Sequence, residues 1–488
     1  MLITDLLIGI RYTVFQGSED LNVKSIAWDS RKVENNALFI CVKSKSVDRH
    51  DFALEAIDAG AKALIVEREV PGIPDDITVI KVEDTRKAMA VVAGHFYGNP
   101  SHELNVIGIT GTNGKTSVAW IVAKLLELGN RKSGIIGTID NTIGEQSTQV
   151  EKLNPTTPDA LELQGTLREM LDAGVTDVAV EVTSIALEYH RVDNCAFRVG
   201  VFTNLTPDHL DEHGDMNRYK NAKLKLFKMC RYGVINADDV IFDEIMESAT
   251  CEKIWSYGID RDADFKASDL SYTETGVKFT LHFKGNGYDI HLKTPGKFSV
   301  YNALAGIGAC YVSGMSIKDI VKFIQTIGSV KGRFEPVFNK KGTMTIVDYA
   351  HTPDGLENIL SAVRAFGKRK VIVVFGCGGD RDKTKRPVMG EIAGRLADLC
   401  ILTSDNPRSE NPYSIISEIE SGIKRSSQSY EIIEDRKEAI YRALDIADSE
   451  DVVVIAGKGH ESYQIYSDRI IPFDDGELVR NYDFSSRR

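Results

Sequence analysis

A glycine-containing stretch, Val106-Ile-Gly-Ile-Thr-Gly-Thr-Asn-Gly-Lys-Thr-Ser117, carries the residue types that hold a phosphate group. Gly111 and Gly114 let backbone N–H groups point at the phosphate. Lys115 can neutralise its β and γ oxygens, and the Thr116 hydroxyl can bind Mg²⁺. The strict motif has a further glycine where this chain has an isoleucine, so the loop is a variant. A glycine-rich strand–helix turn without a ligand is the alternative, but the pattern favours an enzyme that uses a nucleoside triphosphate.

Acidic, histidine and lysine side chains follow two other strand-like runs. Glu181 closes one run, where a carboxylate could ligate Mg²⁺ or simply cap the following turn. His209 lies in a polar stretch after the next run and could serve a metal or a phosphate. The helix expected over 219–227 presents Lys223, which taken alone is typical of a solvated basic face. These residues are candidates for a metal site beside the loop.

Three polar segments follow strand-like runs in the last third of the chain: Gly376–Asp382, Ser404–Arg408 and Gly457–Glu461. In open α/β sheets, ligands bind outside the carboxyl ends of the strands. Arginines in the first two segments could bind carboxylates through bidentate hydrogen bonds, and the glutamate of the third could accept a hydrogen bond from an ammonium group. Together the segments predict a site for a zwitterion that resembles an amino acid.

Arg333 stands at a junction between two α/β patterns, and Asp348 closes the next strand-like run. An arginine at a junction can close onto a γ-phosphate as domains move, or it can form a structural ion pair. Asn302, ahead of an Ala- and Gly-rich helix, could contact a base or ribose, although turn chemistry alone also explains an asparagine there.

Alternating strands and helices must position these residues, which predicts an α/β protein with mostly parallel sheets. We expect three domains at 1–98, 99–332 and 333–488, the second with a small β hairpin around 279–292 and the third Rossmann-like. The predicted strands are 25–28, 37–42, 63–66, 78–82, 106–109, 133–137, 178–182, 198–202, 233–236, 345–348, 371–375, 399–403 and 452–456, and the predicted helices are 51–59, 85–97, 118–126, 219–227 and 300–313.

Composition limits the class of protein. Of the 488 residues, 42% are hydrophobic, which is enough for large cores, and the net charge of −12 argues against a nucleic-acid binder. The seven cysteines are scattered without a Cys-x-x-Cys pair, so neither a disulfide framework nor a zinc site is indicated. The first ten residues lack the basic start of a signal peptide, and no apolar run is long enough to span a bilayer. We therefore expect a cytoplasmic protein.

The motifs, in this order, resemble those of the Mur ligase family, most closely its diaminopimelate-adding members. The resemblance covers essentially the whole chain. It rests on Thr110–Thr116, Asp208–Asp211, Asp348–Asp354, Gly378–Asp382 with Lys385–Pro387, Asp405–Arg408 and Gly457–Glu461.

The resemblance implies an ATP-dependent amide ligase of peptidoglycan precursor synthesis. ATP would phosphorylate a carboxylate of UDP-N-acetylmuramoyl-L-alanyl-D-glutamate, and the amine of meso-diaminopimelate would attack the acyl-phosphate, releasing phosphate. The first domain would hold the UDP end, the second ATP and the third the amino acid. Two Mg²⁺ sites and a CO₂-derived carbamate on Lys223 are also implied. We expect a monomer whose partners are small-molecule substrates, without nucleic acid or membrane insertion.

The resemblance also assigns residues to each role. Catalysis would use Lys115, Glu181, His209 and Lys223, and the metals would bind Thr116, Glu181, His209 and Lys223. ATP would contact Gly111, Thr112, Asn113, Gly114, Lys115, Thr116, Ser117, Asn302, Arg333 and Asp348. The UDP-linked acceptor would contact Ser30, Thr156, Thr157, Thr183 and Arg191. Diaminopimelate would contact Arg381, Asp405, Asn406, Pro407, Arg408, Gly457 and Glu461. Arg408 favours diaminopimelate, because lysine-adding members lack the Asp-Asn-Pro-Arg pattern.

Departures from the family pattern gather on the acceptor side: Ser44, Arg49, Pro155, Ile185, Tyr189 and Ser299. They leave open a related enzyme that ligates an amino acid to a different carboxylate acceptor. A non-catalytic nucleotide-binding partner protein is a further alternative. The presence of Lys115, Glu181, His209 and Lys223 argues against it.

Overall fold

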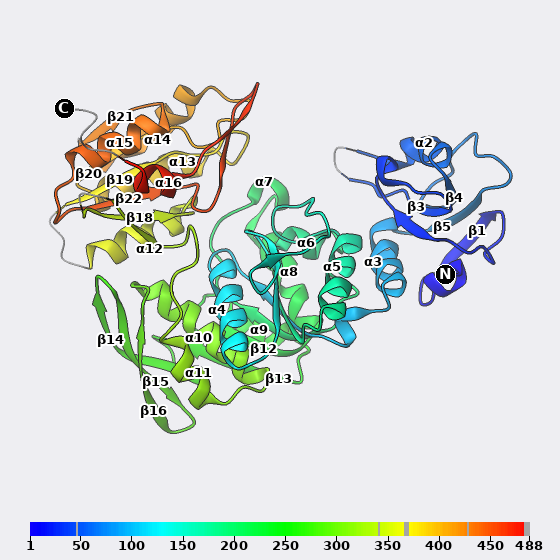
Figure 1. The fold of residues 1–488 in the computed structure, drawn as a ribbon, viewed down its shortest axis with the longest axis horizontal. Helices are drawn as coiled ribbons and strands as arrows, with labels where there is room; N and C mark the ends of the chain where they lie inside the picture. The colour runs from blue at the N-terminus through cyan, green and yellow to red at the C-terminus, as the bar shows by residue number, and fades with distance from the viewer. Residues whose placement is uncertain (45–46, 340–341, 366–369, 427–428, 483–488) are drawn as a thin grey trace.

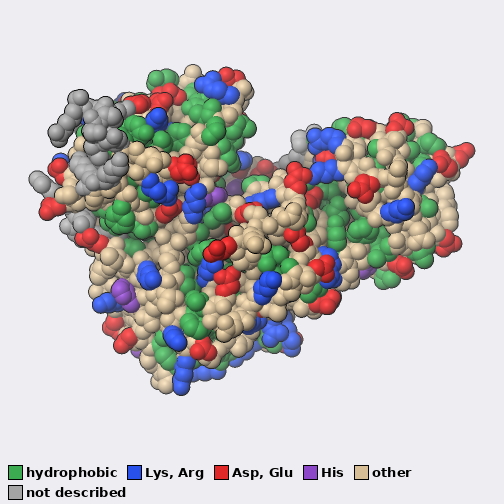
Figure 2. Space-filling view, in the orientation of Figure 1, with side chains coloured by type: hydrophobic (Ala, Val, Ile, Leu, Met, Phe, Trp, Pro, Cys, Tyr) green, Lys and Arg blue, Asp and Glu red, His purple; other side chains and the backbone are tan. Residues whose placement is uncertain are grey.

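A computed structural model describes residues 1–44, 47–339, 342–365, 370–426 and 429–482. Figure 1 shows three lobes, each built on its own sheet: an N-terminal lobe in blue, a central lobe in cyan to green and a C-terminal lobe in yellow to red. The expected α/β class is confirmed. No helix of the described residues is long and apolar enough to cross a membrane. Figure 2 shows acidic and basic side chains interspersed over the visible face.

The N-terminal lobe holds a five-stranded sheet in the order β1-β5-β4-β3-β2. All neighbours are parallel except β1, which runs antiparallel to β5 at one edge. The apolar strands are buried on both faces, as a sheet covered on both sides requires. The elements are α1 (Ile3–Leu6), β1 (Tyr12–Gln16), β2 (Ser25–Ala27), β3 (Ala37–Ile40), α2 (Ala53–Asp58), β4 (Ala61–Val66), β5 (Thr78–Val82) and α3 (Thr85–Phe96).

The central lobe holds an eleven-stranded sheet in the order β16-β15-β14-β13-β12-β11-β6-β10-β7-β8-β9. Within this sheet, β6 is parallel to both of its neighbours, β11 and β10, so the carboxyl ends of these three strands share one edge. The elements are β6 (Asn105–Thr110), α4 (Lys115–Leu128), β7 (Ser133–Ile136), β8 (Asn141–Ile143), β9 (Gln146–Ser147), α5 (Ala160–Asp172), β10 (Asp177–Glu181), α6 (Ser184–Glu188), β11 (Phe197–Phe202), α7 (Leu210–His213), α8 (Met216–Leu224), β12 (Cys230–Asn236), α9 (Phe242–Ser248), β13 (Lys253–Gly258), β14 (Phe265–Thr273), β15 (Gly276–Phe283), β16 (Asn286–Leu292), α10 (Lys297–Val312) and α11 (Ile317–Ile324).

The C-terminal lobe holds a six-stranded sheet in the order β17-β18-β22-β19-β20-β21, parallel apart from the edge strand β17. Arg436 donates two hydrogen bonds to Asp475 at full burial, which ties α15 to α16. The elements are β17 (Glu335–Phe338), β18 (Met344–Asp348), α12 (Pro353–Arg364), β19 (Val371–Phe375), α13 (Lys385–Leu396), β20 (Leu399–Leu402), α14 (Pro412–Ser426), β21 (Tyr430–Ile432), α15 (Arg436–Ile446), β22 (Val452–Ala456), β23 (Tyr463–Ile465), β24 (Ile470–Pro472) and α16 (Asp475–Arg480).

Most predicted elements are present, with shifted ends. The hairpin turn falls at Lys284 and Gly285, whose φ values of 48° and 76° suit a two-residue turn. Its strands extend the edge of the central sheet through β14. The helix predicted over 219–227 starts earlier and ends at Leu224, followed by a 3₁₀ turn over Lys225–Lys228. The domain boundaries at 98 and 332 stay predictions.

Candidate active site

The phosphate-binding stretch lies where β6 ends at Thr110 and α4 begins at Lys115. Gly111 and Gly114 have φ values of 148° and 88°, in the region that favours glycine. A Cβ on Gly111 would lie 1.9 Å from Thr203 Oγ1, so a larger residue would collide with the loop after β11. The close backbone turn at a helix N-terminus is a cradle of the kind that binds phosphate.

Two lysine ammonium groups converge on one carbonyl of this cradle. Lys115 Nζ donates to Gly111 O at 2.9 Å and to Thr112 O at 2.7 Å, and Lys223 Nζ donates to Gly111 O at 2.8 Å. Burial lowers the pKa of both lysines, and the charge of Lys115 lowers that of Lys223 further. Lys223 is 2% exposed, so it does not belong to a solvated basic face. The excess positive charge suits an anionic ligand.

Glu181 lies beside the cradle with its carboxylate held from two sides. Thr116 Oγ1 donates to Oε2 at 3.0 Å, while the Thr138 hydroxyl and backbone N–H donate at 2.9 and 2.8 Å. The structure therefore brings together a hydroxyl and a carboxylate that were both predicted as metal ligands. Oxygen donors of this kind are the ones that Mg²⁺ prefers.

His209 makes no hydrogen bond with that pair among the described residues. It has a φ of 53°, stands at the N-cap of α7, and places Nε2 3.4 Å from Asp208 Oδ2. Among the described residues, no three His, Cys, Asp or Glu side chains gather to hold a metal ion. The predicted ligand set contains only two such side chains, Glu181 and His209, so a metal would also need Thr116, a modified Lys223 or phosphate oxygens. The metal sites stay a prediction.

Arg333 reaches the cradle from the segment that joins the central and C-terminal lobes. Its Nη2 donates to Thr116 Oγ1 at 3.2 Å, and its guanidinium lies 4.3 Å from the centre of the Tyr349 ring. Its buried Nε contacts no hydrogen-bond acceptor among the described residues. Asp348 accepts from the backbone of Phe334 and Ala350, and burial raises the pKa of this carboxyl. Arg333 is thus available to an anion, whereas Asp348 fixes the junction.

A cavity of about 370 Å³ extends from the cradle between the central and C-terminal lobes. Asn302 lines one wall of the cavity. It packs close to Gly114, since a Cβ on that glycine would lie 2.5 Å from Asn302 Oδ1. Asn113 closes another wall by donating to Asp354 Oδ2 at 2.6 Å across the two lobes. Ser117 and Arg333 also line the cavity. Its size is within the range of small-molecule sites, and its position suits the nucleoside of a triphosphate.

The predicted acceptor residues of the central lobe surround the end of β10. Thr157 Oγ1 donates to Glu181 O at 2.8 Å and accepts from Thr183 N at 3.1 Å. Thr156 Oγ1 lies 3.2 Å from Thr138 Oγ1, and Arg191 Nη1 donates to Thr157 O at 3.0 Å. These four residues therefore surround the strand end that carries Glu181.

Ser30, the remaining predicted acceptor contact, lies in the N-terminal lobe, where its hydroxyl donates to Glu55. The structure does not bring it to the other four. The nearby Trp28 reaches the central lobe, since its Nε1 donates to Glu162 at 2.9 Å. An acceptor that contacted all five residues would have to extend from one lobe into the other.

The predicted amino-acid residues meet in the C-terminal lobe. Asn406 donates to Glu461 Oε2 at 2.9 Å, and the fully buried Lys458 donates to both side chains. A Cβ on Gly457 would lie 2.6 Å from Asp405 Oδ2, a buried oxygen without a hydrogen-bond partner among the described residues. The three strand-end segments thus lie side by side and form one polar cluster, which we call the amino-acid pocket.

Arg408 and Arg381 lie on the other side of this pocket. Arg408 has a φ of 52° and donates through Nη1 to Gly379 O at 2.8 Å. A Cβ on Gly378 would lie 2.9 Å from Arg408 Nη1 and 3.8 Å from Arg381 Cγ, and one on Gly379 would lie 1.9 Å from Pro407 O. The glycines allow the segments to pack closely beside Arg408, while Arg381 is exposed at their edge.

The sequence patterns do not single out five residues that the structure places at these sites: Thr138, Lys152, Asn204, Asp354 and Lys458. Thr138 holds Glu181, Lys152 donates to the carbonyls at 137 and 138, and Asn204 accepts from the Asn113 N–H. Lys458 and Asp354 stand within recognisable motifs, and Asn204 follows a strand. Thr138 and Lys152 have no sequence signal, because tertiary packing alone brings them here.

Comparisons with known proteins agree with this geometry. Three family models match: "Mur ligase family, catalytic domain" over residues 22–97, "Mur ligase middle domain" over 109–310 and "Mur ligase, glutamate ligase domain" over 332–459. A Clostridium acetobutylicum relative named UDP-N-acetylmuramoyl-L-alanyl-D-glutamate–2,6-diaminopimelate ligase 2 is 46% identical, covering 98% of this chain and 99% of its own.

Two solved structures extend the comparison. One titled as a UDP-N-acetylmuramoyl-L-alanyl-D-glutamate–2,6-diaminopimelate ligase is 33% identical over 94% of each chain, with a TM-score of 0.67. A MurF ligase from Thermotoga maritima in complex with ADP is 21% identical, covers 89% of this chain and 94% of its own, and has a TM-score of 0.64, a likeness of fold alone. The chain therefore belongs to the Mur ligase family of ATP-dependent, amide-forming ligases.

Proposed function

We propose that this chain joins meso-diaminopimelate to UDP-N-acetylmuramoyl-L-alanyl-D-glutamate at the expense of ATP. One observation carries the proposal: Thr116 of the phosphate cradle, Glu181 and Thr138 form a chain of hydrogen bonds that leads to Thr156. This chain joins the predicted ATP site to the predicted acceptor site. The names of the relatives supply the acceptor and the amino acid.

The cradle residues would prepare the first step. Lys115 and Arg333 would balance the charge of the γ-phosphate while an acceptor carboxylate oxygen attacks its phosphorus. The products of this step are ADP and an acyl-phosphate. Thr116 would hold a first Mg²⁺, and Glu181 and His209 would hold a second; when bound, the two ions would withdraw charge from the phosphate oxygens. Thr156 and Thr157 would orient the acceptor chain beside them.

Lys223 would act after carbamylation, which we include in the proposal. Only a neutral amine reacts with CO₂, and burial beside Lys115 lowers the pKa of Lys223, which favours that form. The added carboxylate would replace a buried neutral amine with an anion. This anion would attract the Lys115 ammonium group and add an oxygen ligand for the metal.

The C-terminal pocket would take the amino acid. Arg408 and Arg381 would bind a carboxylate, and Glu461 and Asp405 would accept from an ammonium group. Asn406, Pro407 and Gly457 would shape the pocket around them. The free amine would then attack the acyl carbon, expelling phosphate and closing the amide bond. The seven free cysteines support a location in a reducing compartment such as the cytoplasm. The proposed site is assembled from one chain, which supports a monomer.

A related enzyme with a different acceptor is the second candidate, favoured by residues on the acceptor side. Arg49 lies over the Trp28 ring at 4.4 Å, and Tyr189 packs under Arg86. These contacts occupy positions where the family pattern has other residues.

An assay of ADP release and ligated product distinguishes the two candidate functions. The enzyme is given UDP-N-acetylmuramoyl-L-alanyl-D-glutamate with meso-diaminopimelate and, in parallel, the same acceptor with L-lysine. We expect product with diaminopimelate and at least tenfold less with lysine. Absence of product with this acceptor would reject the first candidate, and equal use of lysine would reject the amino-acid assignment.

A further inference from the structure

Two arginines from different lobes share one aspartate where α3 of the N-terminal lobe packs against the central lobe. Arg191 Nε lies 3.0 Å from Asp159 Oδ1, and Arg86 Nη1 lies 4.0 Å from the same oxygen. The Asp159 side chain is 7% exposed and both arginine side chains are 16% exposed. One carboxylate thus faces two guanidinium groups, which leaves a local excess of positive charge.

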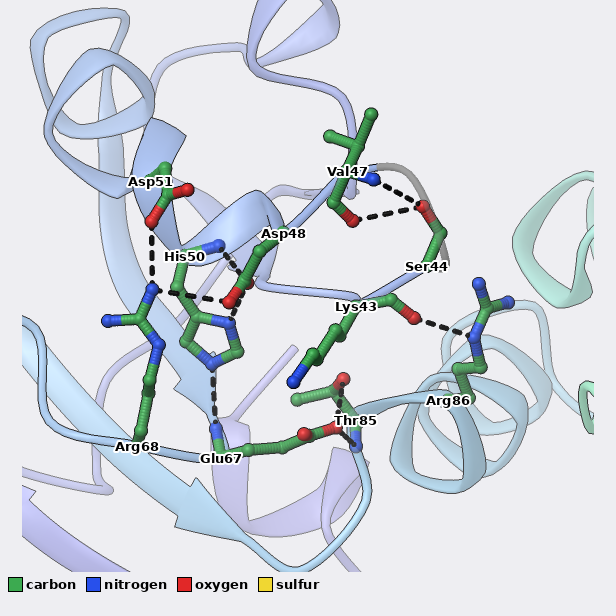
Figure 3. A network of polar contacts seen from close by, with 10 residues as sticks. All are labelled: Lys43, Ser44, Val47, Asp48, His50, Asp51, Glu67, Arg68, Thr85 and Arg86. Carbon is green, nitrogen blue, oxygen red and sulfur yellow. Dashed lines mark hydrogen bonds and ion pairs between the residues drawn. The ribbon is translucent and has the colours of Figure 1, made fainter.

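The hydrogen bonds of Arg86 leave its terminal nitrogens available. Its Nε donates to Lys43 O at 3.0 Å, as Figure 3 shows, while the terminal nitrogens point away from that carbonyl. They donate no hydrogen bond to any residue that the structure describes. The guanidinium carbon Cζ lies over the Tyr189 ring, 4.7 Å from its centre. Arg86 is therefore fixed in place with donors to spare.

The aspartate is also incompletely bonded. Its Oδ2 accepts from Asn154 at 2.8 Å, but the buried Oδ1 accepts no hydrogen bond from the described residues, and neither does Arg191 Nε donate one. The other charged group that acts on Arg86 is Asp84, at the N-cap of its own helix. His190 lies 4.0 Å from Asp84 but pairs with Asp193. Asp84 is 33% exposed and also faces Lys87, so Asp159 is the buried carboxylate that the two arginines share.

The cluster adjoins the predicted acceptor site. Arg191 Nη1 donates to Thr157 O, and Thr157 Oγ1 donates to the carbonyl of Glu181. An acceptor that ends in D-glutamate carries two carboxylates, separated by the α-carbon and two methylene groups. If one is phosphorylated beside Glu181, the other must lie a short distance away and needs a cationic partner.

We propose that Arg86 and Arg191 together hold the acceptor carboxylate that is not phosphorylated. Arg86 would then be a specificity-determining residue, supplied by the N-terminal lobe to a reaction in the central lobe. This proposal rests on the proposed function. It also gives Tyr189 a role, since the ring holds the Arg86 guanidinium at the boundary between the lobes by a cation–π contact.

The test compares two acceptors in wild type and variants. One acceptor is UDP-N-acetylmuramoyl-L-alanyl-D-glutamate, and the other is the same molecule with its α-carboxylate converted to an amide. Acceptor KM and ATP KM are measured for wild type, Arg86→Ala and Arg86→Lys. Lys87→Ala is the matched control, because Lys87 is the next residue on α3 and its side chain is 61% exposed.

We expect amidation to raise the acceptor KM of wild type on the order of 30-fold, the cost of losing a charged hydrogen-bond pair. Arg86→Ala raises the KM of the unmodified acceptor by about tenfold. In this variant, amidation of the acceptor raises the KM only a few-fold further. Arg86→Lys is intermediate, Lys87→Ala matches wild type, and ATP KM is constant throughout.

The opposite pattern would overturn the proposal. If amidation raises the acceptor KM of Arg86→Ala by the same factor as that of wild type, Arg86 does not bind the carboxylate and only stabilises the contact between the two lobes. The Lys variant keeps the comparison available if the Ala variant unfolds. Failure of the proposed function looks different, because wild type would then make no product from the unmodified acceptor, whereas calorimetric binding of the two acceptors without ATP would still report on Arg86.

Discussion

The phosphate cradle and the amino-acid pocket are both polar and buried, yet they treat charge in opposite ways. At the cradle, Lys115 and Lys223 share one carbonyl and Arg333 approaches from the next lobe. In the pocket, Lys458 is paired with Glu461 through a 2.8 Å contact. The difference follows from the ligands that we propose. A triphosphate brings several negative charges to the cradle, whereas a zwitterion brings almost no net charge and suits a site that is already balanced.

The comparison makes the cradle the region more sensitive to loss of a cation. Lys115→Ala should lower kcat by about 10³-fold, because a positioned charge in a dry site is worth several kcal/mol at the transition state. ADP release under saturating substrates measures the loss, and thermal unfolding checks that the variant is folded. A loss of less than tenfold would place the γ-phosphate away from Lys115.

Lys223→Ala should lower kcat by about 10²-fold, and short carboxylic acids should restore part of it by replacing the carbamate. Lys225→Ala is the matched control, since Lys225 is close in sequence but 40% exposed and paired with Glu188. Wild type should also lose turnover in buffer stripped of CO₂ and regain it with bicarbonate. Undiminished turnover in Lys223→Ala would remove this residue from the mechanism.

Arg408→Ala should raise the KM of diaminopimelate about tenfold and leave the ATP KM unchanged, because the arginine binds a single carboxylate in a balanced pocket. Arg469→Ala serves as the control, with a 60% exposed side chain in the same lobe. Steady-state kinetics with each substrate varied separate the two constants. An equal rise in both would mean that the amino-acid pocket lies elsewhere.

The smallest expected effect is on stability. Burial lowers the folded-state pKa of Lys115 and Lys223 below the ordinary lysine value. The unfolded chain then binds more protons, so the free energy of unfolding should rise with pH between the folded and unfolded pKa values. We expect a gain of about 1 kcal/mol per pH unit at most from each group, measured by urea unfolding between pH 7 and 9 in CO₂-stripped buffer, where Lys223 carries no carbamate. Lys223→Met should flatten this slope, and a slope equal to wild type would show that Lys223 keeps its proton.

The same two regions differ in how far sequence predicts them. The cradle follows from local rules, because positive φ at Gly111 and Gly114 and the strand–helix order leave a readable pattern. Arg408 and Glu461 are readable as well, since both follow strands of one sheet. Arg86 is not, because an arginine on an amphipathic helix has no signal until the lobes pack together.

Metal binding shows the same limit. Thr116 and Glu181 are predicted as metal ligands, and the structure joins them by a hydrogen bond. They meet because Thr116 lies in the first turn of the helix after β6 and Glu181 ends the neighbouring strand β10. His209 is predicted from its polar surroundings, but its left-handed backbone and its contact with Asp208 follow from a loop that local patterns do not define. Thr138 holds Glu181 from a turn after β7 that carries no motif.

The proposed function requires the phosphate cradle to be directed at an acceptor carboxylate. The most direct test uses acceptor labelled with ¹⁸O in its D-glutamyl carboxylates and follows the label by mass spectrometry of the released phosphate. Formation of an acyl-phosphate predicts one ¹⁸O atom in each phosphate formed with product. Phosphate without ¹⁸O, released in step with amide formation, would contradict the proposed function.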